Sequence, residues 1–341
     1  MSRHDGTGPE TAGPAGGDGV LFRILGPVEF HDERTGRWIR PSGAKQRALL
    51  GALLVKAGQI VSVPRLIDEL WGGHPPAHAA NALQAHVARL RRVLPTAPGT
   101  AGEPRHDRVV TRSLGYVLRL GGATTDADLF NRLAAEGRAA AVGDPGHGAG
   151  LLRRALSLWR GPALEGSVRG TVCAAEAALL EENRLTALEA LYDACLRTGR
   201  HREITGELEE LTSDHPVRER FYDLLMVALY RCGRPAEALG VHDRARMHLA
   251  LELGVEPGPV LRGRMEAILR HDPALALCGP ADPLPAAVHH PPAPLPEAAV
   301  LPLTDEIARL RRHVERLTWE QEALIRRFDH LSALAASARV R

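Results

Sequence analysis

The segment PPAHAANALQAHVARLRRVL, residues 75–94, decides the fold of the first part of the chain. At about 100° per residue, a helix from His78 to Leu94 places its larger apolar side chains on one face. That face is predicted to be buried, and it consists of Leu83, Val87, Leu90 and Leu94. The opposite face carries Asn81, Ala85, Ala88 and Arg92, flanked by Gln84, Arg89 and Arg91.

The exposed face of this helix has the side chains of a helix that reads DNA. Asn and Gln can pair with adenine edges, and Arg can bind guanine or phosphates. The small side chains of Ala85 and Ala88 allow the helix backbone to enter a groove deeply. A solvated surface helix with an arginine-rich face is the alternative interpretation.

The elements predicted around this helix occur in a recognisable order. Alternation of apolar and polar residues at 21–40 predicts strands, and two helices follow, one from a Ser42 cap to about Lys56 and one from Val63 to Leu70. Residues 108–120 predict a hairpin with Thr111 and Arg112 near its tip. Strands, three helices and a hairpin are the element order of a winged helix-turn-helix.

Charge is divided unevenly along the chain, although its net charge is only +2. Residues 21–120 contain 15 basic and 7 acidic residues, whereas residues 121–277 contain 19 basic and 23 acidic residues. A basic segment joined to an acidic one favours a nucleic-acid-binding domain followed by a protein-binding domain. Two solvated surfaces that differ by chance remain an alternative.

The region from 126 to 270 shows only helical periodicity and contains an internal repeat. Leu196–Arg200 aligns with Tyr230–Arg234 at an offset of 34 residues, and Glu203 aligns with Glu237 at the same offset. This is the length of a tetratricopeptide helix pair, with Gly199 and Gly233 in the turns. Stacked helix pairs form surfaces that bind other proteins, although a helical scaffold that only positions the first domain is also compatible with the pattern.

Several segments together resemble one known family. RILGPVEF (23–30), SGAKQRALLGALLVKAGQIVSVPRLIDELWG (42–72), residues 75–94 and VTRSLGYVLRL (110–120) resemble the DNA-binding domain of the antibiotic-pathway regulators called the SARP family. That domain is similar to the OmpR-type winged helix. LLRRALSLWRGPAL (151–164) and residues 229–275 resemble the bacterial transcriptional activation domain. The resemblance covers about residues 21–277.

The resemblance implies a transcriptional activator of a secondary-metabolite gene cluster. Such a protein binds direct repeats of double-stranded DNA beside a promoter and contacts the RNA polymerase holoenzyme. Recognition would fall to the third helix, at Asn81, Gln84, Ala85, Ala88, Arg89 and Arg92. Phosphates or the minor groove would be held by Lys45, Arg47, Arg91, Thr111 and Arg112. A repressor with the same fold, or a helical scaffold that binds protein, remains an alternative.

Two C-terminal segments, 278–302 and 303–338, lie outside the family resemblance. Residues 278–302 are rich in proline and predict a linker. Residues 303–338 keep a heptad pattern and predict a coiled coil through which the chain self-associates, or else a helix folded onto the repeats. The predicted contacts between helices are Leu310, Val314, Leu317, Gln321, Leu324, Phe328 and Leu331. Residues 1–20 lack periodicity and predict disorder.

The expected fold is mainly α: a winged helix with a small sheet at 21–120, an all-α repeat domain at 121–277, and the C-terminal helix. The sequence has neither a phosphate-binding GxxxxGK[ST] loop nor an HExxH zinc pair, and its four cysteines form no CxxC pair. We therefore expect no enzyme activity, cofactor or metal. No apolar stretch approaches 18 residues, so we expect a cytoplasmic protein.

Overall fold

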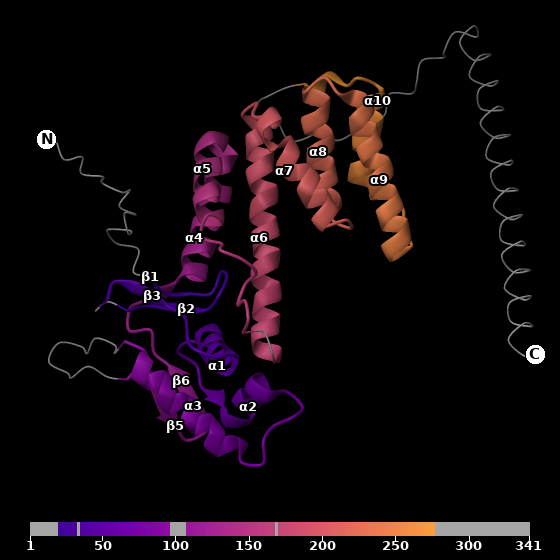
Figure 1. Ribbon diagram of the computed structural model, residues 1–341. Coiled ribbons are helices and arrows are strands. Elements are labelled where there is room, and N and C mark those ends of the chain that lie inside the picture. The colour runs from indigo at the N-terminus through magenta and orange to yellow at the C-terminus, as the bar shows by residue number, and fades with distance from the viewer. Residues whose placement is uncertain (1–19, 33–34, 96–106, 168–169, 277–341) are drawn as a thin grey trace, which may run out of the picture. The chain divides into compact units, whose positions relative to one another are not determined.

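The computed structural model describes residues 20–32, 35–95, 107–167 and 170–276 (Figure 1). The predicted linker and the predicted coiled coil, with all seven of its proposed contact residues, lie outside the described residues. None of the described helices is long and apolar enough to cross a membrane.

The chain begins with a four-stranded sheet in the order β3-β2-β1-β7. Its strands are β1 (Val20–Arg23), β2 (Glu29–Asp32), β3 (Arg37–Ile39) and β7 (Thr124–Thr125). The first three strands are antiparallel and follow from the alternation seen at 21–40. The fourth, β7, runs parallel to β1, so the sheet is completed by a strand more than a hundred residues later in the chain.

Three helices and a second sheet complete the winged helix. The helices are α1 (Ala44–Val55), α2 (Val63–Trp71) and α3 (Ala79–Val93), and the sheet has the order β4-β6-β5. Its strands are β4 (Val61–Ser62), β5 (Val109–Arg112) and β6 (Gly115–Leu118). Gly115 is required there, because a Cβ at this position would lie 2.0 Å from the Val61 carbonyl oxygen. The predicted order of strands, three helices and hairpin is confirmed.

Two details of the prediction are corrected by the structure. Ser42 does not cap α1: the N-cap residue is Gly43 and no side chain bonds the first turn. The short strands β4 and β7 were absent from the prediction, because two residues carry no readable alternation and their partners are distant in sequence.

The rest of the described chain is helical. Its elements are α4 (Asp126–Gly143), α5 (Pro145–Leu156), α6 (Thr171–Arg197), α7 (His201–Asp214), α8 (Glu219–Arg231), α9 (Pro235–Leu253), α10 (Pro259–Leu269) and the short 3₁₀ helix η1 (Pro273–Leu275). The helix α8 forms the centre of this part, because its side chains from Phe221 to Leu229 are all buried.

The predicted 34-residue repeat is visible in two turns of identical construction. Gly199, between α6 and α7, has φ 75°, and Gly233, between α8 and α9, has φ 76°. In each turn the next residue's N–H bonds a carbonyl five residues earlier: Arg200 to Cys195 at 2.9 Å, and Arg234 to Leu229 at 3.0 Å. Each arginine then pairs with a glutamate three residues on, Glu203 or Glu237. Both glycines therefore occupy the turn positions that the repeat predicted.

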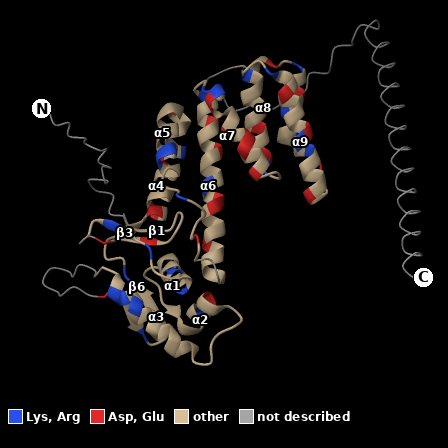
Figure 2. Ribbon diagram, viewed as in Figure 1, with Lys and Arg blue, Asp and Glu red and all other residues tan. Residues whose placement is uncertain are grey.

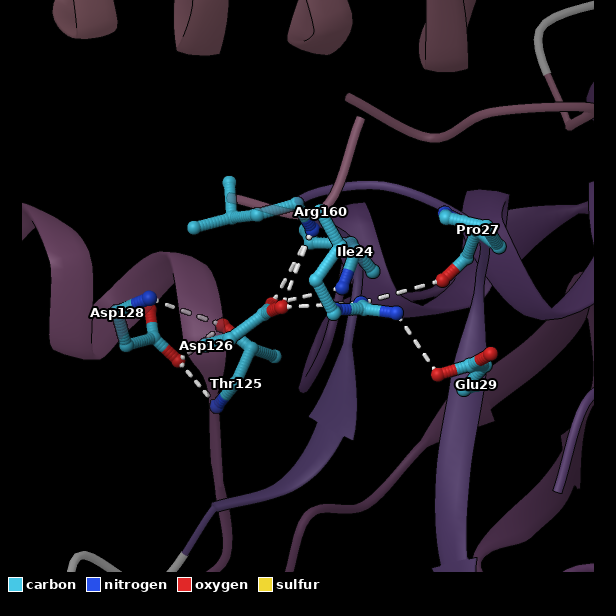
Figure 3. A network of polar contacts seen from close by, with 8 residues as sticks. Ile24, Pro27, Glu29, Thr125, Asp126, Asp128 and Arg160 are labelled. Atoms are coloured by element: carbon cyan, nitrogen blue, oxygen red, sulfur yellow. Dashed lines mark hydrogen bonds and ion pairs between the residues drawn. The ribbon is translucent and has the colours of Figure 1, made fainter. Parts of the chain in front are cut away.

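A buried carboxylate joins the first sheet to the helical part (Figure 3). Asp126, at the start of α4, is 2% exposed and accepts hydrogen bonds from the backbone N–H groups of Ile24, at 2.7 Å, and Leu25. The guanidinium of Arg160, in the loop after α5, lies 3.3 Å from the Asp126 carboxylate and 2.8 Å from Glu29. Backbone bonds from Arg160 to Leu25 and from Leu164 to Ile24, both 2.8 Å, extend this junction.

A second buried carboxylate joins α2 to α6. Glu69 is fully buried and accepts hydrogen bonds from the backbone N–H groups of Val172 and Cys173, in the first turn of α6. The first N–H groups of a helix have no partner within the helix, so Glu69 supplies an acceptor and a favourable charge. Burial, together with Glu69, raises the pKa of the Cys173 thiol. The winged-helix fold thus caps the longest of the described helices.

We predict that Glu69→Ala lowers the free energy of unfolding by about 1–3 kcal/mol, because two buried N–H groups lose their acceptor. Its neighbour Asp68 is exposed, so Asp68→Ala is a matched control that should change stability by less than about 0.5 kcal/mol. Denaturant unfolding of both variants measures this difference, and equal stabilities would contradict the capping role.

Candidate nucleic-acid interface

The buried face of α3 fixes the orientation of this helix. Leu83, Val87 and Leu90 are at most 1% exposed, and Leu94, just after the helix, is also buried. The helix packs against α1 and α2 through this face. The predicted core positions are therefore confirmed, and the orientation of the remaining side chains follows from them.

The outer face of α3 is exposed along its length. Six residues predicted to read DNA lie on it: Asn81, Gln84, Ala85, Ala88, Arg89 and Arg92. Neither Arg89 nor Arg92 has an ion-pair partner among the described residues. Figure 2 shows basic residues on α3 and beside the hairpin, whereas acidic and basic residues are mixed on α6 to α9. The face thus presents donors and positive charge that nothing within the described chain neutralises.

Arg91 connects α3 to the hairpin. Its Nε donates to the Val109 carbonyl at 2.8 Å, and its Nη2 donates to the Thr111 hydroxyl at 2.8 Å. Asp107 lies 3.8 Å from the same guanidinium. Arg91 and Thr111, both predicted to hold phosphates, are therefore bonded to each other and set the position of β5 relative to α3.

Arg112 lies at the end of β5, where the hairpin turns. It is exposed and has no ion-pair partner in the described part of the chain. Leu114, two residues further on in the turn, is 70% exposed. Arg112 is held on a strand whose register with β6 is fixed by the Arg112–Gly115 pair. Arg112 therefore presents its guanidinium to solvent next to the hairpin turn.

Lys45 forms a cluster with three residues that the sequence did not single out: Gln46, Trp71 and His86. The Lys45 ammonium lies 4.8 Å from the centre of the Trp71 ring, and His86 meets the same ring edge-on at 5.9 Å. Gln46 bonds His86 through its Nε2, at 3.0 Å from the ring Nδ1 and 3.2 Å from the backbone carbonyl.

This cluster links α1 to α3 and favours the uncharged form of His86. Burial, with the charges of Arg89 and Lys45, lowers the pKa of His86, which suits a neutral ring that accepts from Gln46. Nothing in the sequence indicates that His86 joins α1 to α3, because its hydrogen-bond partner Gln46 lies 40 residues earlier in the chain.

Arg47, predicted to hold a phosphate, lies beside the loop that joins the two parts of the chain. Its side chain faces the loop before α6, where a Cβ on Gly166 would lie 3.4 Å from the Arg47 Nε. One turn further along α1, Gly51 packs against Leu164 and Ser167 of the same loop. Arg47 therefore belongs to the junction between the two parts of the chain, and we do not include it among the proposed DNA contacts.

Two family descriptions match this chain over the folds described above. Residues 41–118 match "Transcriptional regulatory protein, C terminal", and residues 125–269 match "Bacterial transcriptional activator domain". The chain is 43% identical to the transcriptional regulator RedD of Streptomyces coelicolor, over 75% of this chain and 72% of that protein. It is 40% identical to the regulatory protein DnrI of Streptomyces peucetius, over 79% of this chain and 99% of that protein. The chain belongs to the SARP family of transcriptional activators.

A solved structure supports the same arrangement of domains. Mycobacterium tuberculosis EmbR, in complex with a low-affinity phosphopeptide, matches with a TM-score of 0.66 and 32% identity. The match covers 75% of this chain and 67% of that chain. Members of the SARP family are DNA-binding transcriptional regulators, so the winged helix is the DNA-binding part of this regulator.

We predict that Arg91→Ala lowers the free energy of unfolding by about 1–2 kcal/mol, since the hairpin loses two charge-assisted bonds to α3. Arg92→Ala is the matched control one residue away, and it should cost less than about 0.5 kcal/mol because Arg92 is exposed and unpaired. Chemical denaturation compares the two, and a cost for Arg92→Ala as large as that for Arg91→Ala would contradict this division of roles.

Proposed function

We propose that this regulator activates transcription by inserting α3 into the major groove of promoter DNA. The observation that carries the proposal is the outer face of α3, which is exposed, polar and basic while its inner face is fully buried. Asn81 and Gln84 have the amide groups that pair with adenine, and Arg89 and Arg92 have the forked donors that pair with guanine. Ala85 and Ala88 leave room for the groove walls.

The proposed contacts to the DNA backbone lie on both sides of this helix. Arg112 would bind a phosphate or the minor groove from the hairpin, as an unpaired guanidinium can. Lys45 would contribute a charge from the first turn of α1. Arg91 and Thr111 act mainly by holding the hairpin against α3, which fixes the distance between base-reading and phosphate-binding side chains.

The proposed targets are direct repeats beside the promoter of a secondary-metabolite gene cluster. Direct repeats would arrange protomers head to tail on the duplex, with each α3 in successive major grooves. The helical part, which matches the bacterial transcriptional activator domain, would contact the RNA polymerase holoenzyme. The heptads at 303–338 would add self-association through Leu310, Leu317, Leu324 and the other core positions. The family supports the proposed promoter targets and the polymerase contact, the exposed face of α3 supports the reading of DNA, and the heptad pattern alone supports the self-association.

We predict different effects for the two exposed arginines. Arg92→Ala should weaken binding to the specific site by about 1–3 kcal/mol and relax sequence preference, because a base contact is lost. Arg112→Ala should weaken binding to specific and scrambled duplexes alike and lower the salt slope by about one unit, because one phosphate contact is lost.

Binding isotherms on both duplexes at several salt concentrations measure these effects. The exposed side chain of Arg202, on α7, offers a matched control, since Arg202→Ala removes the same charge away from the winged helix. Unchanged affinity of Arg92→Ala for the specific site would show that α3 does not read the bases.

A further inference from the structure

His86 lies at the edge of the outer face of α3, close to two basic side chains. Arg89 is three residues further along the helix, so the two side chains are neighbours on one flank of α3. On its other side, His86 meets the Trp71 ring edge-on at 5.9 Å, and the Lys45 ammonium lies over that ring at 4.8 Å. The half-buried imidazole therefore lies near Lys45, a proposed backbone contact, and near Arg89, a proposed base contact.

The hydrogen bonds of Gln46 determine which ring nitrogen of His86 carries the proton. Gln46 is 3% exposed, and one end of its amide lies 3.2 Å from the His86 backbone carbonyl and 3.0 Å from the ring Nδ1. A carbonyl oxygen only accepts hydrogen bonds, so this end must be the NH2 group, since the opposite orientation would bring two oxygens together. Nδ1 is then an acceptor, and the proton of the neutral ring lies on Nε2.

The other ring nitrogen, Nε2, is accessible. It has no hydrogen-bond partner among the described residues, and it is not one of their buried unpaired polar atoms, so it reaches solvent. Burial, with the charges of Arg89 and Lys45, lowers the pKa of His86 and favours the neutral ring. His86 therefore presents to solvent one N–H donor that carries no charge.

We infer that His86 is a further DNA contact, whose Nε2–H donates to a phosphate oxygen of the DNA backbone, and that Gln46 is the positioning residue that orients it. This inference rests on the proposed insertion of α3 into the major groove. Ala85 and Arg92 lie along the middle of the outer face, whereas His86 lies about 100° around the helix from Ala85, toward α1. A helix in the major groove meets the sugar-phosphate backbone on its flanks, so a side chain placed there reaches phosphates rather than bases.

The variant H86N separates the two roles of the ring. The asparagine oxygen can accept from Gln46 in place of Nδ1, but no donor remains at the position of Nε2. We expect H86N to bind specific and scrambled duplexes alike about ten-fold more weakly than the parent chain, because a hydrogen bond to a charged group is lost. Unlike Arg112→Ala, it should leave the salt slope unchanged, because no charge is removed.

A matched control comes from α5. His147 is exposed and lies away from the winged helix, so H147N makes the same change outside the proposed interface. It should bind both duplexes like the parent chain. All binding is measured well below the unfolding midpoint of each variant.

The variant Q46L tests the positioning role of Gln46, because leucine has a similar size but cannot donate. Q46L should weaken binding as much as H86N does, and Q46L/H86N should bind no more weakly than either variant, because all three lack the same contact. The ¹⁵N NMR signals of the His86 ring give a readout that a general loss of stability would not move. The parent chain should show a single tautomer with the proton on Nε2, and Q46L should show the Nδ1–H tautomer beside it.

Several results would overturn the inference. H86N could bind both duplexes like the parent chain, or it could lose affinity for the specific duplex alone, in which case His86 reads a base. A parent ring with its proton on Nδ1, or a further loss of affinity in Q46L/H86N, would contradict the role of Gln46.

Arg92→Ala, measured beside H86N, keeps this inference distinct from the proposed function. If Arg92→Ala weakens specific binding and H86N does not, the inference about His86 fails and the reading of DNA by α3 stands. If neither variant weakens specific binding, both proposals fail.

Discussion

The carboxylate of Asp126 holds the first sheet and the helical part together. Its burial is costly and raises its own pKa, against the opposing effect of two backbone N–H groups and of Arg160. The hydrogen bonds at this junction offset the cost. The backbone N–H of Ile24, just after β1, donates to Asp126 of α4, and the backbone carbonyls of Ile24 and Leu25 accept from the loop after α5. Removing one partner of such a buried pair leaves the other uncompensated, so the sheet and the helices depend on each other for their stability.

The junction restricts how the regulator can work. Glu69 of the winged helix accepts a hydrogen bond from the first turn of α6, and Asp126 of α4 accepts one from Ile24, just after β1. Each region therefore supplies a buried carboxylate that binds backbone N–H groups of the other. A hinge with free rotation is incompatible with these contacts, because each would leave a buried group unsatisfied. The helical part is therefore held at a fixed orientation to α3.

Local sequence patterns predicted the features that depend on residues close together in the chain, such as helix faces and turns. The spacing of Leu83, Val87 and Leu90 predicted the buried face of α3, and the 34-residue offset predicted the turns at Gly199 and Gly233. Contacts between distant residues were not predictable in this way. The strand β7 forms because Thr124 and Thr125 reach β1, and Ser42 does not cap α1 because the helix begins after Gly43. The roles of Arg47 and Arg91 depend on partners that only the tertiary fold brings close.

Nearly every positive charge in this chain is an arginine, so residue type alone cannot separate structural from functional charges. Many arginines of the helical part pair with carboxylates, whereas several arginines of the winged helix do not. In the helical part, Arg218 pairs with Glu182 and Glu189, Arg264 with Asp223, and Arg244 with Glu209. In the winged helix, Arg89, Arg92 and Arg112 find no such partner among the described residues, and neither do Arg40 and Arg47. An unpaired guanidinium keeps its full capacity to bind an oxyanion. The uneven charge of the sequence thus becomes, in the folded chain, a set of winged-helix arginines that no described carboxylate neutralises.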